Sequence, residues 1–231
     1  MACGSHCRGI PGTRLRENAA GARSSVTKLA GSGTLAAPVV LPREFYLRPT
    51  LTVARQLIGA RLVRIFRGHQ LVGIITEAEA YIGEKDLGCH AKAGRTARTQ
   101  VMYGEPGHAY VYFTYGNHWM LNVVTEREGF PAAVLIRAIQ PVEGVVTMSR
   151  RREGRDTRGP GKLTKAMGIS GSDNCTDLTG ARSSLRIELG IKVPESLVTK
   201  GPRVGLNTVP EPWKSKPWRF RMRETPPLTR D

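Results

Sequence analysis

A series of short β-rich runs, separated by links that contain glycine, occupies the centre of this chain and constrains its fold more than any other feature. The runs are residues 61–66, 71–81, 109–115, 119–125 and 132–139. The link Gly116, Asn117 and His118 is of the kind that closes a β-hairpin. Helical patterns flank the runs at residues 50–57, 143–152 and 162–167. The pattern predicts an α+β fold, a single domain built on a mostly antiparallel β-sheet with flanking helices and a protruding β-hairpin.

Residues 1–40 differ in composition from the rest of the chain. They are rich in Gly, Ala, Ser and Arg, contain Glu17 as their one acidic residue and show no sustained periodicity. Such a composition predicts a disordered basic tail, with the folded domain over residues 41–231. An arginine-rich, acid-poor stretch is also typical of an organelle transit peptide, and that alternative stays open.

The chain carries a large excess of positive charge. Its 35 Lys and Arg side chains against 19 Asp and Glu give a formal net charge of +16. A field of this sign attracts polyanions, so nucleic acid is the expected partner. The sequence contains no run of about 18 apolar residues and no long basic amphipathic helix, which argues against a membrane.

The four cysteines show no metal-binding or disulfide pattern. Without a CxxC pair, the sequence predicts neither a disulfide framework nor a structural zinc site, and it is typical of a reducing compartment. His90 follows Cys89, but no further ligand stands at a regular spacing, so no metal is expected there. We interpret His108 and His118 as structural or surface residues.

Two carboxylates and a phenol alternate in the segment TEAEAYIG, residues 76–83. On a strand, Glu77, Glu79 and Tyr81 share one face. A solvated sheet edge would explain such a pair of acids, whereas a carboxylate inside a basic cleft is a salt-bridge partner or a general base. Arg137 ends the apolar run VLIR and needs an acid if it is buried, with Glu79 and Glu143 as the competing partners.

The segment YVYFTYG concentrates tyrosines in the expected hairpin. Tyr110 and Tyr112 lie on one face, where flat polar rings suit base stacking, although a well-packed hairpin has the same pattern. Tyr115 at the hairpin tip is a candidate wedge for a base step. His90 is a candidate for stacking or hydrogen bonding to a base. Asn122 is an amide in an apolar run, which either bonds a backbone group or reads a ligand.

A basic stretch surrounds GPGKLTKAMG, residues 159–168. It only superficially matches a phosphate loop, because Pro160 occupies the position that the lysine would need, and we exclude a nucleoside triphosphatase. A helix that starts at Gly159, with Lys162 in its first turn, would hold a backbone phosphate. A solvated helix face is the alternative.

Several ordered blocks carry a resemblance to a known family. They are TEAEAY, His90 nine residues after Tyr81, GRTAR, MYGEPGHAYVYFTYG, LNVV, VLIRAIQPVEG and GPGKL. Taken together, the chain from about residue 41 to residue 221 resembles the alkyladenine (3-methyladenine) DNA glycosylase family, with residues 41–231 as its catalytic domain.

The resemblance implies a role for each matching residue. Glu79 corresponds to the general base that activates water, and Arg137 to the arginine that helps to hold that water and the acid. Tyr81, His90 and Tyr112 correspond to the walls of the pocket for a flipped base.

Other implied roles concern the duplex. Tyr115 corresponds to the tyrosine that fills the gap left in the helix, and Asn122 to the amide that disfavours guanine. Arg95, from the GRTAR block, and Lys162 are expected to contact the DNA backbone.

The implied activity is that of a monofunctional DNA-3-methyladenine glycosylase of base excision repair, which uses no cofactor. Its expected partner is double-stranded DNA with damaged purines of the 3-methyladenine type, 7-methylguanine, hypoxanthine or ethenoadenine. We expect a monomer, located with the nucleoid in a bacterial cytoplasm or in the nucleus or an organelle of a eukaryote. A non-catalytic nucleic-acid-binding domain and a formyltransferase-type fold that contacts tRNA or the ribosome are the alternatives.

Overall fold

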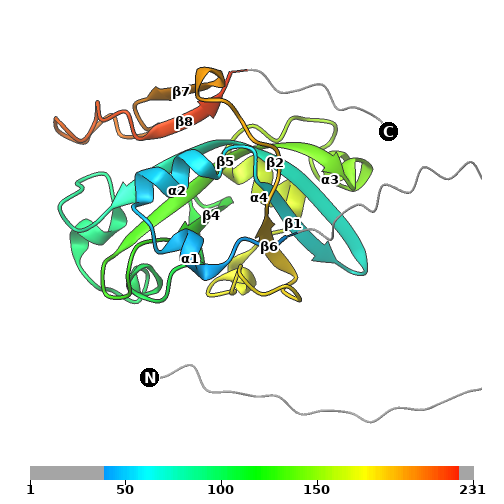
Figure 1. Cartoon of the computed structure of the whole chain (residues 1–231), viewed down its shortest axis with the longest axis horizontal. Coiled ribbons are helices and arrows are strands. Elements are labelled where there is room, and N and C mark those ends of the chain that lie inside the picture. Colours follow the sequence, from blue (N-terminus) through cyan, green and yellow to red (C-terminus); the bar gives the residue numbers. More distant parts are fainter. Residues whose placement is uncertain (1–38, 224–231) are drawn as a thin grey trace, which may run out of the picture. The chain divides into compact units, whose positions relative to one another are not determined.

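The computed structural model describes residues 39–223, and its strands form one antiparallel sheet (Figure 1). The strands are β1 (Arg61–Phe66), β2 (His69–Ile82), β3 (Ala109–Thr114), β4 (His118–Val124), β5 (Ala132–Glu143), β6 (Leu185–Glu188), β7 (Val198–Gly201) and β8 (Arg219–Met222). The helices are α1 (Arg43–Tyr46), α2 (Thr50–Gln56), α3 (Val145–Arg151) and α4 (Pro160–Met167). Residues 1–38 of the predicted tail lie outside the described residues. Its last two residues, Val39 and Val40, pair with the end of β6.

The central strand β2 has neighbours along both edges. The strand order is β3-β4-β5-β2-β1-β6, and β8 pairs with both β2 and β7. β1 pairs with β2 from residue 69 to residue 74, whereas β8 pairs with it from residue 77 to residue 79. The register with β5 shifts on both sides of Glu77, which marks β-bulges. The segment with the two carboxylates is therefore enclosed between β5 and β8.

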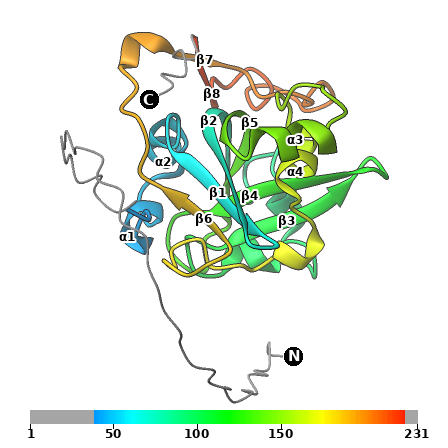
Figure 2. The same ribbon diagram turned by 90° about the vertical axis from the view of Figure 1, so that its right-hand side faces the viewer.

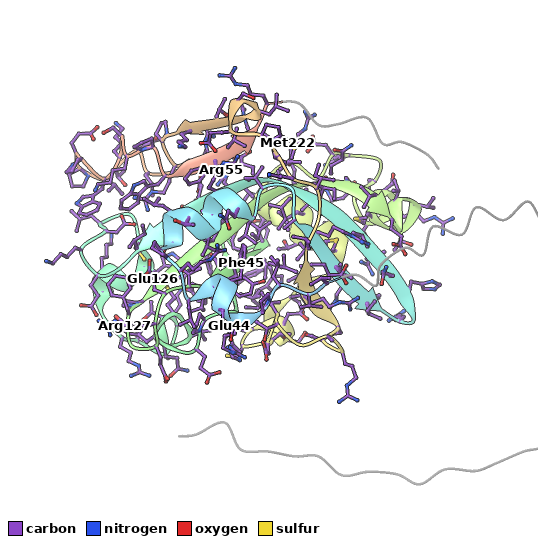
Figure 3. All side chains as sticks on the ribbon, viewed as in Figure 1. Glu44, Phe45, Arg55, Glu126, Arg127 and Met222 are labelled. Atoms are coloured by element: carbon purple, nitrogen blue, oxygen red, sulfur yellow. The ribbon has the colours of Figure 1, made fainter. Side chains whose placement is uncertain are left out.

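Helices α2 and α4 contribute to one apolar core with the sheet. Figure 2 separates α1 and α2 on the left from α3 and α4 on the right. Pro49 cannot cap α2 with a side chain, and Glu126 does so instead, because its Oε1 accepts hydrogen bonds from the backbone N–H and the hydroxyl of Thr50 at 2.7 and 2.8 Å. Glu126 is labelled in Figure 3, in the segment that follows β4.

The predicted strands and helices occur, with altered ends. β5 continues to Glu143 where the sequence predicted an end at residue 139, and Arg137 is thus inside the strand. α3 begins two residues later than predicted, after Gly144, whose φ of 69° turns the chain. The sequence did not predict α1 and the short strands β6, β7 and β8, because four-residue elements carry too few residues for a recognisable period.

The β3–β4 hairpin extends beyond the neighbouring elements in Figure 2, as expected for the protruding hairpin. Its turn contains Tyr115 and Gly116 with φ of 52° and 69°. Positive φ is uncommon for tyrosine, so the turn holds Tyr115 in a backbone conformation that few tyrosines adopt. Within residues 39–223, no helix has the length and apolar character needed to cross a membrane.

Candidate functional site

A cavity of about 440 Å³ opens between the hairpin, β2, β5 and the start of α4. Seven of the nine predicted site residues line it, namely Tyr81, His90, Tyr112, Tyr115, Asn122, Arg137 and Lys162. The volume suits a small organic ligand, since ligand pockets span about 300–1,000 Å³. Glu79 and Arg95 are outside the lining set.

Glu79 is fully buried directly behind this wall. Its Oε2 accepts hydrogen bonds from the Tyr81 hydroxyl at 2.9 Å and from Arg137 at 3.3 Å, and its Oε1 accepts the backbone N–H of Val204 at 2.8 Å. All three donors belong to residues that line the cavity. The carboxylate is thus one hydrogen-bonded neighbour away from the cavity surface.

Burial is the largest influence on the Glu79 carboxyl and raises its pKa. Arg137, the Val204 N–H and the Tyr81 hydroxyl act in the opposite direction, because they stabilise the ionised form. A carboxylate with a raised pKa and several fixed donors is suited to accept a proton.

Arg137 joins both acids of the TEAEAYIG segment. Its Nε donates to Glu77 at 2.9 Å while a terminal nitrogen reaches Glu79. The alternative partner Glu143 was wrong, because that carboxylate accepts a hydrogen bond from Gln70 at 3.0 Å across the β2–β5 pairing. Desolvation is the largest influence on the Arg137 guanidinium, yet the two carboxylates prevail and its pKa is raised.

Three aromatic rings pack together in the cavity wall. The His90 and Tyr112 ring centroids are 4.6 Å apart at 72°, and those of Tyr110 and Tyr112 are 5.2 Å apart. His90 Nδ1 shares a hydrogen bond of 3.0 Å with the Tyr110 hydroxyl. Burial, Arg98 and Lys92 lower the pKa of His90 to about 4, so the imidazole is neutral near pH 7.

Asn122 bonds a backbone group, which is the first of its two sequence-based interpretations. Its Nδ2 donates to the backbone carbonyl of Tyr110 at 3.1 Å, so the amide is tied to the neighbouring strand. The residue also lines the cavity and is 4% exposed. The side-chain orientation is therefore fixed before any ligand binds.

Tyr115 stands out from the hairpin tip with 79% of its surface exposed. Lys162 lies in the first turn of α4 and forms an exposed ion pair of 3.4 Å with Asp156. The backbone N–H of Gly159 donates to the Arg137 carbonyl at 2.9 Å, which ties the start of this helix to β5. Arg95 is exposed, with its guanidinium 5.5 Å from the Tyr103 ring centroid.

Tyr110, which the sequence placed on one face with Tyr112 as suited to base stacking, also lines the cavity. His118 lines it as well, although we interpreted that residue as structural or surface-exposed. Arg98, whose guanidinium lies 4.8 Å from the Tyr112 ring centroid, stands in the GRTAR block. Val204 had no signal in the sequence, because it acts through its backbone N–H.

No group of three or more His, Cys, Asp or Glu that could hold a metal ion occurs within residues 39–223.

Comparisons with known proteins give a consistent result. The family model described as methylpurine-DNA glycosylase (MPG) matches residues 44–226. The chain is 47% identical over 189 residues to a Myxococcus xanthus protein named "Putative 3-methyladenine DNA glycosylase", with 80% of this chain and 91% of that protein covered. Proteins with the same name from Methanocella arvoryzae and Carboxydothermus hydrogenoformans are 47% and 44% identical, with 81% and 80% of this chain and 94% and 96% of those proteins covered.

Proposed function

The chain belongs to the methylpurine-DNA glycosylase family, and we propose that it flips alkylated or deaminated purines out of duplex DNA and hydrolyses their N-glycosidic bond. The product is an abasic site and a free base. The expected lesions are of the 3-methyladenine type, with 7-methylguanine, hypoxanthine and ethenoadenine as further candidates.

The observation that carries this proposal is the position of Glu79. Its carboxylate is buried, and the residues that donate hydrogen bonds to it line a cavity walled by aromatic rings. A domain that only binds nucleic acid gains nothing from a buried acid beside a base-sized cavity, because burial of a charge is costly. The same argument disfavours a fold that merely contacts tRNA or the ribosome.

In the proposed reaction, Glu79 accepts a proton from water while that water attacks C1′ of the flipped nucleotide. The carboxylate also stabilises the positive charge that develops on the sugar, and Arg137 holds the carboxylate in place through the 3.3 Å contact. The electron pair of the C1′–N bond leaves with the purine, which departs readily when it carries a positive charge.

The aromatic wall supports recognition of a purine. Tyr81 and Tyr112 offer π faces for a flipped base, and a cationic base gains about 0.5–2 kcal/mol from such a contact. A damaged base also stacks and pairs poorly, which lowers the cost of flipping. Tyr115, exposed at the hairpin tip, is suited to occupy the gap in the duplex.

The net charge of +16 supports binding to the phosphate backbone, where Lys162 and Arg95 are the proposed contacts. We also propose that the protein acts as a monomer. The test is excision from duplex oligonucleotides that hold hypoxanthine, ethenoadenine or 7-methylguanine, followed by alkaline strand cleavage. Strand breaks at the lesion support the proposal, whereas tight binding without base release would establish the binding domain instead.

A further inference from the structure

Behind the cavity wall lies a second buried ion pair, between Asp86 and Arg203. The two terminal nitrogens of Arg203 donate to the two carboxylate oxygens of Asp86 at 2.5 and 2.8 Å, and both side chains are 0% exposed. The same carboxylate accepts the backbone N–H groups of Ile82 and Gly88 at 3.2 and 3.0 Å. This bidentate pair is fully desolvated and rigidly held.

The guanidinium of Arg203 lies against Tyr81. Its Cζ is 4.7 Å from the Tyr81 ring centroid and 5.0 Å from that of Trp218. Tyr81 lines the cavity but Arg203 does not, so the guanidinium covers the ring from outside the cavity. The face of Tyr81 that remains for a flipped base therefore has a cation behind it.

Arg203 also holds the backbone that reaches Glu79. It donates to the carbonyls of Ala80 at 3.1 Å and Trp213 at 3.3 Å, and the next residue, Val204, gives its N–H to Glu79. Arg203 thus holds the segment beside Glu79 in place, and it also puts a positive charge next to the Tyr81 ring.

A lone cation behind an aromatic ring opposes a second cation in front of it, because both draw on the same π electrons and repel each other through a dry interior. Asp86 supplies the compensating negative charge. The binding of a neutral purine to the same ring would depend little on the charges of Arg203 and Asp86.

We propose that Asp86 is a specificity-determining residue, which neutralises Arg203 and so keeps Tyr81 attractive to positively charged purines. This inference rests on the proposed function, in which the flipped base stacks on Tyr81. It predicts that the charge balance of the pair sets the ratio of activity on cationic lesions to activity on neutral lesions.

The test compares Asp86→Asn, Arg203→Met and the double variant with the unmodified protein. Single-turnover excision is measured on one duplex with cationic 7-methylguanine and one with neutral hypoxanthine. Asp86→Asn should lower the ratio of the two rates by about tenfold, the scale of a desolvated cation–π contact, and Arg203→Met should raise it. The double variant should return within about twofold of the original ratio, because it removes both charges.

The opposite signs separate this role from a structural one, because loss of structure would slow both substrates together. If Asp86→Asn does not fold, the ratio for Arg203→Met decides, since Asp86 then keeps its two backbone donors. If one lesion is excised too slowly to time, the ratio of dissociation constants in a Glu79→Gln background replaces the ratio of rates.

One ratio shared by all four proteins would overturn this inference and leave the proposed function standing. Failure of the unmodified protein to release either base would instead overturn the proposed function.

Discussion

Replacement of Glu79 by glutamine is the sharpest perturbation of the site, because the amide preserves the size of the side chain and removes its charge. Glutamine cannot accept the proton of the attacking water, and general base catalysis contributes about 10²–10⁴-fold. We expect excision to fall by that factor, about 2.7–5.4 kcal/mol in barrier height. Binding to lesion-containing duplex should be retained, because the cavity wall and the basic surface are unchanged.

Glu77→Gln is the matched control. Glu77 is two residues away on the same strand and binds the same Arg137, at 2.9 Å, but its side chain is 17% exposed, whereas that of Glu79 is 0% exposed. Its amide oxygen can still accept from Arg137, so excision should stay within about tenfold of the unmodified protein. The assay is single-turnover excision with binding measured in parallel.

Glu79→Gln also has an expected effect on the pH dependence of the stability of the fold. Burial raises the pKa of Glu79 above its value in the unfolded chain, so the folded state binds the proton more tightly. The folded state is therefore favoured by this group at low pH, and that advantage is lost as pH rises through the raised pKa. Because glutamine stays neutral, the Tm of the unmodified protein relative to that of Glu79→Gln should rise as the pH falls through the raised pKa.

The raised pKa also predicts the acidic limb of the rate profile. Excision should decline with falling pH through the pKa of Glu79, at a pH above the usual carboxyl range. Near-normal turnover in Glu79→Gln, or equal losses in the two glutamine variants, would refute the assignment of Glu79 as the base.

Three further predictions concern other parts of the site. Tyr115→Ala should lower the excision rate with little change in Tm, because the side chain is 79% exposed. Phe113→Ala on the same hairpin is the control, and an unchanged rate in Tyr115→Ala would show that Tyr115 does not help to distort the DNA. Gly161→Ala should destabilise the fold by about 1–3 kcal/mol in denaturant titration, because the new Cβ would be 2.6 Å from His118 Cγ. The His90 imidazole should show no protonation in an NMR titration between pH 6 and pH 8, because its pKa is lowered to about 4, and a midpoint inside that interval would contradict its burial in the wall.

The strand pattern and the motif chemistry were accessible from the sequence. Alternation along TEAEAYIG put Glu77, Glu79 and Tyr81 on one face, and the structure has Arg137 bound to both acids with the Tyr81 hydroxyl on Glu79. The position of Tyr110 and Tyr112 on one face followed from the same period-two rule, and the tip position of Tyr115 followed from the glycine-containing link after it. Local periodicity is sufficient for these features because neighbouring residues decide them.

Other features required the tertiary structure, because they join segments that are far apart in the chain. The choice between Glu79 and Glu143 as the partner of Arg137 depended on strand register, which a single sequence does not specify. The N–H of Val204 on Glu79 and the pairing of Arg203 with Asp86 cross more than a hundred residues and leave no periodic trace. The sequence by itself determined which residue types alternate on each strand, whereas folding decided which of them are buried together, because desolvation and long-range hydrogen bonds arise only when distant segments meet.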